Sequence, residues 1–119
     1  MPNRVVHWEI MGKDAKELQS FYADMFDWKV DADNEYNYGM VEGSQAGIGG
    51  GIGGDPSQSM RVSIFVEVDD LQAYLDKAIR LGGKLVMPPT DIAGVSFAMF
   101  ADPAGNVTGI MKDYAEAPA

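Results

Sequence analysis

Apolar and polar residues follow a pattern that occurs twice along the chain. Residues 5–10 mix β-branched, aromatic and polar side chains, as a half-buried strand does. Asp14 then stands three residues before Glu17, which is the spacing of a capping box, and the pattern predicts a helix ending near Asp27. We expect a sheet to cover the apolar stripe of this helix, which consists of Leu18, Phe21, Tyr22, Met25 and Phe26.

The remainder of the first half is predicted to form strands and turns. Residues 28–30 begin a second strand, Asp33 and Asn34 mark a turn, and residues 36–41 form a third strand. Residues 43–54 are rich in glycine, and we interpret the tract at residues 49–54 as a strand whose missing side chains let a ligand, or another backbone, approach closely. This strand would leave open space above it, and in the cup that a family resemblance given below implies, it would form an open floor.

The same pattern starts again at Arg61. Residues 61–68 predict a strand, and Asp69 or Asp70 caps a second helix that stops at Gly82 and Gly83, since glycine adopts the left-handed cap without a steric clash. The apolar stripe of this helix is Leu71, Tyr74, Leu75, Ala78 and Leu81. Further strands are predicted at residues 84–87, 95–100 and 107–111, with breaks at Pro88–Pro89 and at residues 102–106.

This repetition predicts the fold class. A shift of 56 residues aligns His7 with Ser63 and Asp14 with Asp70, so the chain consists of two strand–helix–strand–strand–strand copies. We predict an α+β fold in one domain over residues 1–119, with a repeat at 1–54, a linker at 55–60, a second repeat at 61–113 and a tail at 114–119. A single βαβββ module would expose its sheet face, so we expect the two modules to bury it together.

Composition excludes several kinds of site. The 119 residues suffice for one domain and contain no cysteine, which excludes disulfides, zinc ribbons and thiol nucleophiles. With one histidine, the chain cannot supply two imidazoles to a site. The 18 acidic and 9 basic residues disfavour nucleic acid and anionic membranes as partners. No apolar leader or span is recognisable, so we expect a soluble, cytoplasmic protein.

Five segments, taken in order and spacing, point to a known family. They are His7-Trp8-Glu9-Ile10, Phe21-Tyr22 with Phe26-Asp27-Trp28, Val66-Glu67-Val68-Asp69-Asp70, Leu81-Gly82-Gly83-Lys84, and Phe100-Ala101-Asp102-Pro103-Ala104-Gly105-Asn106. Over nearly its whole length the chain resembles the vicinal oxygen chelate superfamily of glyoxalases, bleomycin-resistance proteins and extradiol dioxygenases. The resemblance implies a curved mixed sheet that forms a cup, helices on the outside, and a homodimer that in some members exchanges modules.

The same resemblance implies a metal site that this chain has lost. In metal-using members, two histidines and two carboxylates in the cup hold the ion, and the histidine positions match His7 and Ser63. One carboxylate position matches Gly109, and the other falls within residues 45–54, which contain no acid. Serine and glycine offer neither a basic nitrogen nor a carboxylate, so we predict no metal and no cofactor.

Strand alternation predicts which side chains face a ligand. If His7 faces the cup, Glu9 does too, and Ser63 likewise shares its face with Phe65 and Glu67. The predicted ligand-binding residues are His7, Glu9, Tyr38, Met40, Gly49, Gly51, Ser63, Phe65, Glu67 and Gly109. The carboxylates of Glu9 and Glu67 would favour a cationic ligand and raise the pKa of His7; they could equally be solvated at the rim or serve a dimer contact.

Three functions remain open on the sequence. The first is a metal-free module that binds a small organic molecule in the cup. The second is an enzyme, either with metal-dependent lyase or oxidoreductase chemistry or without metal and with His7 as catalytic base; His7 could instead be a vestigial ligand bonded to a neighbour. The third is a dimeric scaffold without a ligand. Residues 49–54 formally fit a dinucleotide fingerprint, but no helix follows them, so we do not predict nucleotide binding.

Overall fold

A computed structural model describes residues 2–55 and 60–112 of the chain, and these residues confirm the predicted α+β class. The chain divides into two compact units: the first unit is His7–Val62, and the second unit consists of residues 2–6 together with residues 63–112. The predicted tail at 114–119 and most of the predicted linker lie outside the described residues. None of the described helices is both long enough and apolar enough to cross a membrane.

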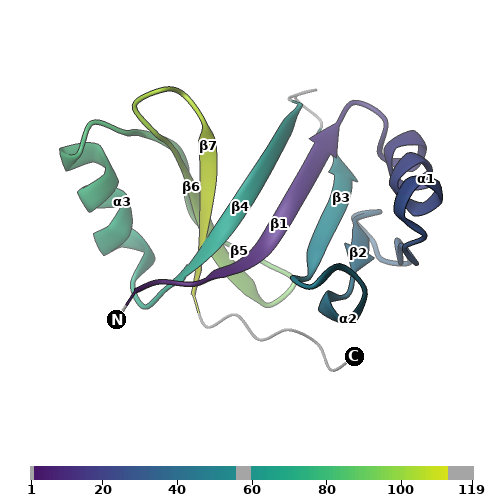
Figure 1. Cartoon of the computed structure of the whole chain (residues 1–119). Helices are drawn as coiled ribbons and strands as arrows, with labels where there is room; N and C mark the ends of the chain where they lie inside the picture. Colours follow the sequence, from purple (N-terminus) through teal and green to yellow (C-terminus); the bar gives the residue numbers. More distant parts are fainter. Residues whose placement is uncertain (1, 56–59, 113–119) are drawn as a thin grey trace. The chain divides into compact units, whose positions relative to one another are not determined.

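The first unit is a small mixed sheet with a helix on one side. Its elements are β1 (Val5–Gly12, of which residues 5 and 6 belong to the second unit), α1 (Ala15–Phe26), β2 (Gly39–Val41), α2 (Gly43–Ala46) and β3 (Gly50–Gly54). Strand β3 runs parallel to β1 and antiparallel to β2, and α1 packs against β3 (Figure 1). As predicted, the Asp14 side chain accepts a hydrogen bond from the Glu17 amide at the start of α1.

The loop between α1 and β2 differs from the prediction. No strand forms at residues 28–30, and only Asp31 pairs with Met40 in an isolated bridge. The strand predicted at residues 36–41 shrinks to Gly39–Val41, because the Asn34 side chain accepts from the amides of Tyr36 and Tyr38. These side-chain bonds take the amide groups that a sheet ladder would need.

The buried side of α1 also differs from the predicted stripe. Gln19 is buried and donates hydrogen bonds to the carbonyls of Asn37 and Ile52. Phe21, Met25 and Phe26 are 57%, 62% and 52% exposed. The helix therefore presents an amide to the backbone of the narrow sheet, and part of its apolar stripe is left uncovered.

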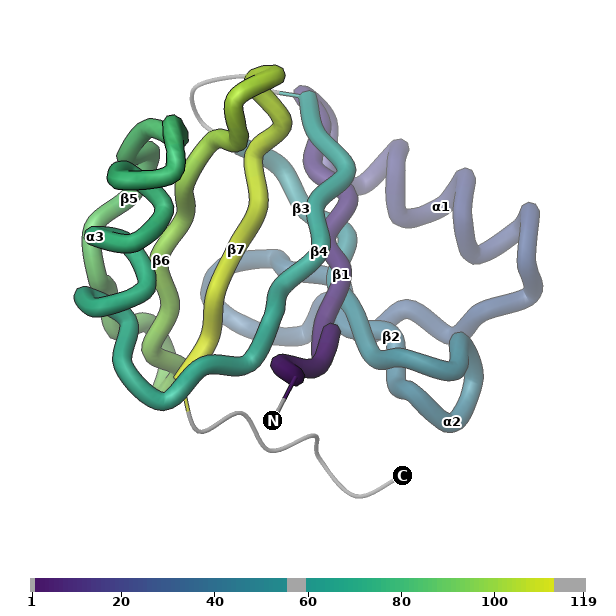
Figure 2. The backbone as a smooth tube through the Cα atoms, turned by 60° about the vertical axis from the view of Figure 1, so that its left-hand side comes forward, coloured from purple at the N-terminus to yellow at the C-terminus, as the bar shows by residue number. Residues whose placement is uncertain are grey.

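The second unit is a four-stranded mixed sheet covered by one helix. Its elements are β4 (Arg61–Val68, of which residues 61 and 62 belong to the first unit), α3 (Leu71–Arg80), β5 (Lys84–Ile92), β6 (Val95–Ala101) and β7 (Val107–Lys112). Strand β7 is parallel to β4 and antiparallel to β6, which pairs with β5. Figure 2 shows α3 alongside β5 and β6. Asp70 caps this helix through the Ala73 amide, and Gly82 ends it with φ of 99°.

Apolar side chains pack on both faces of this sheet. Val68, Leu71, Leu75, Ala98 and Ile110 form the cluster beneath α3, whereas Phe65, Met99 and Met111 cluster on the opposite face. The break predicted at Pro88 and Pro89 is wrong, since β5 runs through both prolines. The strand tolerates them because it is the edge strand and its pairing with β6 shifts register between Met87 and Thr90.

Candidate functional site

His7 lies on β1 and is the buried centre of the predicted site in the first unit. His7 is only 5% exposed, and its Nε2 lies 2.9 Å from the Tyr38 hydroxyl oxygen. Burial lowers the pKa of His7 to about 4 by disfavouring the charged imidazolium. The expectation that carboxylates would raise this pKa is therefore wrong, because desolvation prevails, and the imidazole is neutral at pH 7.

The Tyr38 hydroxyl connects His7 to Glu9. It donates a hydrogen bond to Glu9 Oε2 at 2.9 Å. A phenol carries one proton, so the bond between Tyr38 and His7 requires the imidazole to donate from Nε2. The neutral imidazole is therefore held as its Nε2–H tautomer, with its proton directed at the phenol oxygen.

Glu9 is in turn paired with Arg61. Nη2 of Arg61 lies 3.0 Å from Glu9 Oε1, and Nη1 lies 2.7 Å from Asp55 Oδ2. These three side chains are 13% to 19% exposed, so their charges are partly removed from water. Each carboxylate receives a charge-assisted hydrogen bond from one guanidinium, which offsets part of the cost of burial.

Aromatic rings from neighbouring segments of the first unit pack directly against the backbone of the glycine-rich strand β3. A Cβ added at Gly51 would lie 1.9 Å from Cζ of Tyr38, and one at Gly50 would lie 2.0 Å from Cδ2 of Trp8. The expectation of an open floor at Gly51 is therefore wrong, because the Tyr38 ring occupies the space that the missing side chain leaves. Glycine is needed here for the close approach of rings to the backbone.

The other predicted residues of the first unit lie nearby. Met40 pairs with Gly51 across β2 and β3 and is 42% exposed. Gly51 also pairs with Glu9 across β3 and β1, so these three residues occupy neighbouring positions on three strands. Gly49 precedes β3, and its carbonyl accepts a hydrogen bond from the Trp8 amide.

The predicted residues of the second unit form a separate group. Phe65 pairs with Gly109 in the parallel register of β4 and β7, and a Cβ at Gly109 would lie 2.2 Å from the Phe65 ring. Ser63 is buried, and its hydroxyl donates to the Val107 carbonyl at 2.9 Å. Glu67 lies further along β4 opposite Met111, and its backbone carbonyl accepts from the Asn3 side chain.

These contacts do not fit a metal ion. Nε2 of His7 is engaged by a phenol, the Ser63 hydroxyl is engaged by a backbone carbonyl, and a phenyl ring occupies the space beside Gly109. Across residues 2–55 and 60–112, no group of three or more His, Asp or Glu side chains is arranged to hold an ion. A divalent metal of the zinc or iron type needs about three protein ligands.

Sequence reasoning missed Arg61 and Asp55. Arg61 lies two positions before Ser63 on β4, so strand alternation predicts that both side chains point to the same face. Its partner Glu9 on β1 is 52 positions away and becomes a neighbour only in the folded unit. Asp55 lies in the predicted linker, where a carboxylate is normally solvated. The structure instead ties Asp55 to Gly12 through its amide and to Arg61 through its side chain.

The fold and these residues can be compared with known proteins. Residues 9–111 match the family described as Glyoxalase-like domain, so the chain belongs to this family. It is 31% identical over 78 residues to the protein named "Putative glyoxylase CFP32" in Mycobacterium bovis and Mycobacterium tuberculosis. That match covers 64% of this chain but only 30% of the mycobacterial protein.

Solved structures share the fold at low identity. A glyoxalase/bleomycin resistance protein/dioxygenase superfamily member from Vibrio splendidus is 20% identical with a TM-score of 0.64, covering 94% of this chain and 100% of that one. Methylmalonyl-CoA epimerase from M. tuberculosis is 15% identical with a TM-score of 0.63, covering 96% and 88%. At such identities these likenesses concern the fold alone, and together with the family match they support the vicinal oxygen chelate superfamily.

Proposed function

We propose that the chain binds a small organic molecule without a metal, on the face of the first unit that carries His7, Glu9, Tyr38 and Met40. The observation that carries the proposal is the hydrogen-bonded series from His7 through Tyr38 and Glu9 to Arg61. Ligand sites commonly combine apolar surface with a few fixed polar groups. Here the polar groups are held by one another, and the thioether of Met40 supplies adaptable apolar surface beside them.

The charges favour an uncharged ligand over the cation suggested by the sequence. Glu9 uses Oε1 for Arg61 and Oε2 for Tyr38, so its carboxylate is already neutralised and hydrogen-bonded. His7 is neutral at pH 7 and adds no charge. A neutral molecule with a carbonyl or hydroxyl group and an aromatic or aliphatic body would meet these groups without leaving a buried charge unpaired.

Elemental analysis and native mass spectrometry of the purified protein test this proposal directly. We expect far less than one zinc, nickel, manganese or iron per chain, and a thermal-shift screen that selects neutral aromatic compounds over cationic ones. The response should fall in Tyr38→Phe and persist in the matched control Tyr36→Phe, since Tyr36 is 58% exposed. Stoichiometric metal that disappears in His7→Ala would overturn the metal-free proposal.

The same series of bonds favours a second candidate, a metal-independent acid–base enzyme. A phenol between an imidazole and a carboxylate supplies the proton-transfer pair that the sequence did not reveal. A substrate whose turnover survives both His7→Ala and Tyr38→Phe would exclude this candidate. The third possibility, a scaffold without a ligand, predicts no selective stabilisation in the thermal-shift screen.

We also propose that the chain forms a homodimer. The uncovered side chains of Phe21, Met25 and Phe26 on α1 are apolar surface of the kind that partners cover. Light scattering coupled to size exclusion should give twice the monomer mass. The charge-introducing variant Met25→Lys should shift the mass toward the monomer if α1 takes part.

A further inference from the structure

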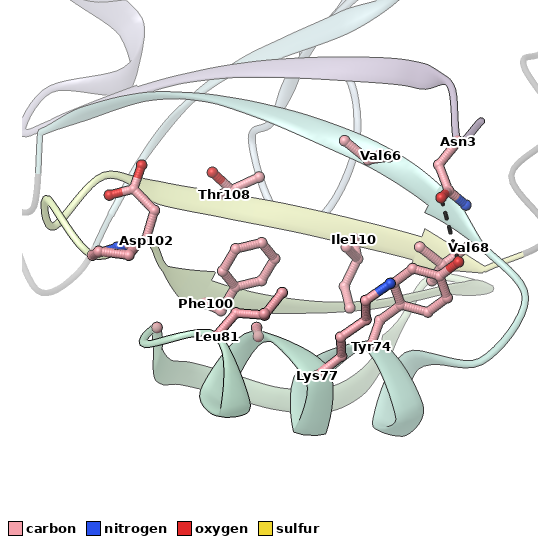
Figure 3. A pocket seen from close by; sticks show the side chains of 13 residues that line it. Asn3, Val66, Val68, Tyr74, Lys77, Leu81, Phe100, Asp102, Thr108 and Ile110 are labelled. Atoms are coloured by element: carbon pink, nitrogen blue, oxygen red, sulfur yellow. Dashed lines mark hydrogen bonds between the residues drawn. The ribbon is translucent and has the colours of Figure 1, made fainter.

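The second unit contains a hollow that the proposed function does not use. It lies between α3 and the strands β4, β6 and β7, is open to solvent, and has a volume of about 340 Å³ (Figure 3). Val66 and Val68 line it, and they alternate along β4 with Phe65 and Glu67. Because alternate side chains point to opposite faces of a strand, the hollow lies on the other side of the sheet from Ser63 and Phe65.

The interior of this hollow is apolar. Strand residues Val66, Val68 and Ile110 form its floor, and Phe100 and Leu81 lie at its side in Figure 3. Its volume falls at the lower end of the range of about 300–1,000 Å³ found for small-molecule sites. The space therefore suits one compact apolar body.

A cation stands at one end of the hollow. The Lys77 side chain runs beside Tyr74, with its ammonium nitrogen 5.8 Å from the ring centroid (Figure 3). The Tyr74 hydroxyl is hydrogen-bonded to the Asn3 side chain at the same end. Within the described part of the chain, Lys77 forms no ion pair, since both ion pairs found there belong to Arg61.

The opposite end carries a carboxylate that the fold already uses. Asp102 accepts hydrogen bonds from the amides of Ala104 and Asn106 and from the Asn106 side chain. These bonds hold the pKa of Asp102 below its usual range, so the group stays charged. The hollow is therefore polarised, with a positive group at the Lys77 end and a negative group at the Asp102 end.

We propose that this hollow is a second ligand site, which takes a small amphipathic carboxylate. The aliphatic or aromatic body lies on Val66, Val68 and Ile110, and the carboxylate meets the Lys77 ammonium, away from Asp102. The site is independent of the function proposed for the first unit, because it uses other residues and a different unit of the chain.

Three probes of equal chain length separate charge from apolar contact: octanoate, octanol and octylammonium. Methyl resonances of Val66, Val68, Leu81 and Ile110 report occupancy in an NMR titration. We expect octanoate to shift these methyl signals with the highest affinity and octylammonium with the lowest. Shifts confined to other residues, or equal affinity for octanoate and octylammonium, would overturn the proposal.

Two variants locate the contacts. Lys77→Gln should weaken octanoate about two- to fivefold, as expected for a solvent-exposed ion pair, and leave octanol unchanged. Ala78→Leu fills the hollow and should weaken both probes. Lys84→Gln is the matched control, because Lys84 is an exposed lysine of the same unit that does not line the hollow. If Ala78→Leu fails to fold, Lys77→Gln alone decides: an unchanged octanoate affinity contradicts the proposal.

Discussion

The hydroxyl of Tyr38 lies between Nε2 of His7 and a carboxylate oxygen of Glu9, at 2.9 Å from each. This arrangement uses the nitrogen that an ion would require and fixes the tautomer of the imidazole. It also makes the phenol the central group of the site, because it joins a neutral base to a carboxylate that Arg61 neutralises.

The pKa of His7 gives the most direct check, because the chain has one histidine and its NMR signal needs no assignment. We expect the imidazole to titrate at about pH 4 in the folded protein and near 6.5 in urea. Above pH 6.5 the imidazole is neutral in both the folded and the unfolded chain, so the contribution of His7 to the free energy of unfolding is at its maximum. Between pH 6.5 and 4 the unfolded chain alone binds a proton, so stability falls as the pH falls.

The loss of unfolding free energy over this window is about 3.5 kcal/mol at most, since each pKa unit corresponds to about 1.4 kcal/mol. Denaturant unfolding of wild type and of His7→Asn at several pH values separates the effect of His7 from that of the carboxylates, because the carboxylates titrate in both proteins. Their difference in unfolding free energy should shrink toward pH 4. A folded-state pKa near 6.5 would contradict the burial described above.

Removal of the Tyr38 hydroxyl should destabilise the protein while leaving the ring in place. Tyr38→Phe takes away the donor to Glu9 and the acceptor for His7, at a cost of about 1–3 kcal/mol. Urea unfolding measures the loss. Tyr36→Phe, at the exposed end of the same loop, should change stability little, and equal losses in the two variants would show that the bonds are unimportant.

A methyl group at Gly51 should displace the Tyr38 ring. Gly51→Ala places a carbon 1.9 Å from Tyr38 Cζ, and we expect a loss of about 1–3 kcal/mol from overpacking. Gly53→Ala is the milder comparison, since its carbon would meet Tyr38 Cδ1 at 3.0 Å. A double-mutant cycle with Tyr38→Ser should reveal positive coupling, because a small side chain at 38 removes the clash.

Arg61 should stabilise the first unit through two carboxylates. Arg61→Gln leaves Glu9 and Asp55 without their cation, and we expect a loss of about 2 kcal/mol, between the values for exposed and buried ion pairs. Arg80→Gln on α3 is the control and should be near neutral, because Arg80 is exposed and forms no ion pair within residues 2–55 and 60–112. Comparable losses in both variants would contradict this assignment.

Local signals predicted α1 and α3 and their ends well, whereas the short helix α2 at Gly43–Ala46 was not predicted. Asp14 and Asp70 cap the two longer helices as expected, and Gly82 takes the left-handed conformation that ends α3. Each of these features depends on residues within a few positions of one another, so the sequence carries the information directly.

The features that were predicted wrongly depend on distant residues. Residues 28–30 form no strand because the amide and carbonyl of Lys29 are hydrogen-bonded to the Gln45 side chain, 16 positions away. The apolar stripe of α1 is partly uncovered because the neighbouring sheet is narrow and built on glycine. At the site, strand alternation placed His7 and Glu9 on one face of β1. The hydroxyl of Tyr38, which joins them, and Arg61, which pairs with Glu9, come from segments about 30 and 50 residues away. Neither pairing leaves a periodic signal in the sequence.

The seating of Phe65 over Gly109 constrains how this chain could change over generations. A carboxylate at position 109 collides with the ring, so the substitution is harmful until position 65 has become smaller. Shrinking position 65 first, however, opens a void in the cluster with Met99 and Met111 and costs stability. Each single step toward a carboxylate at position 109 is thus penalised by itself, and such epistasis preserves the present pair of phenylalanine and glycine.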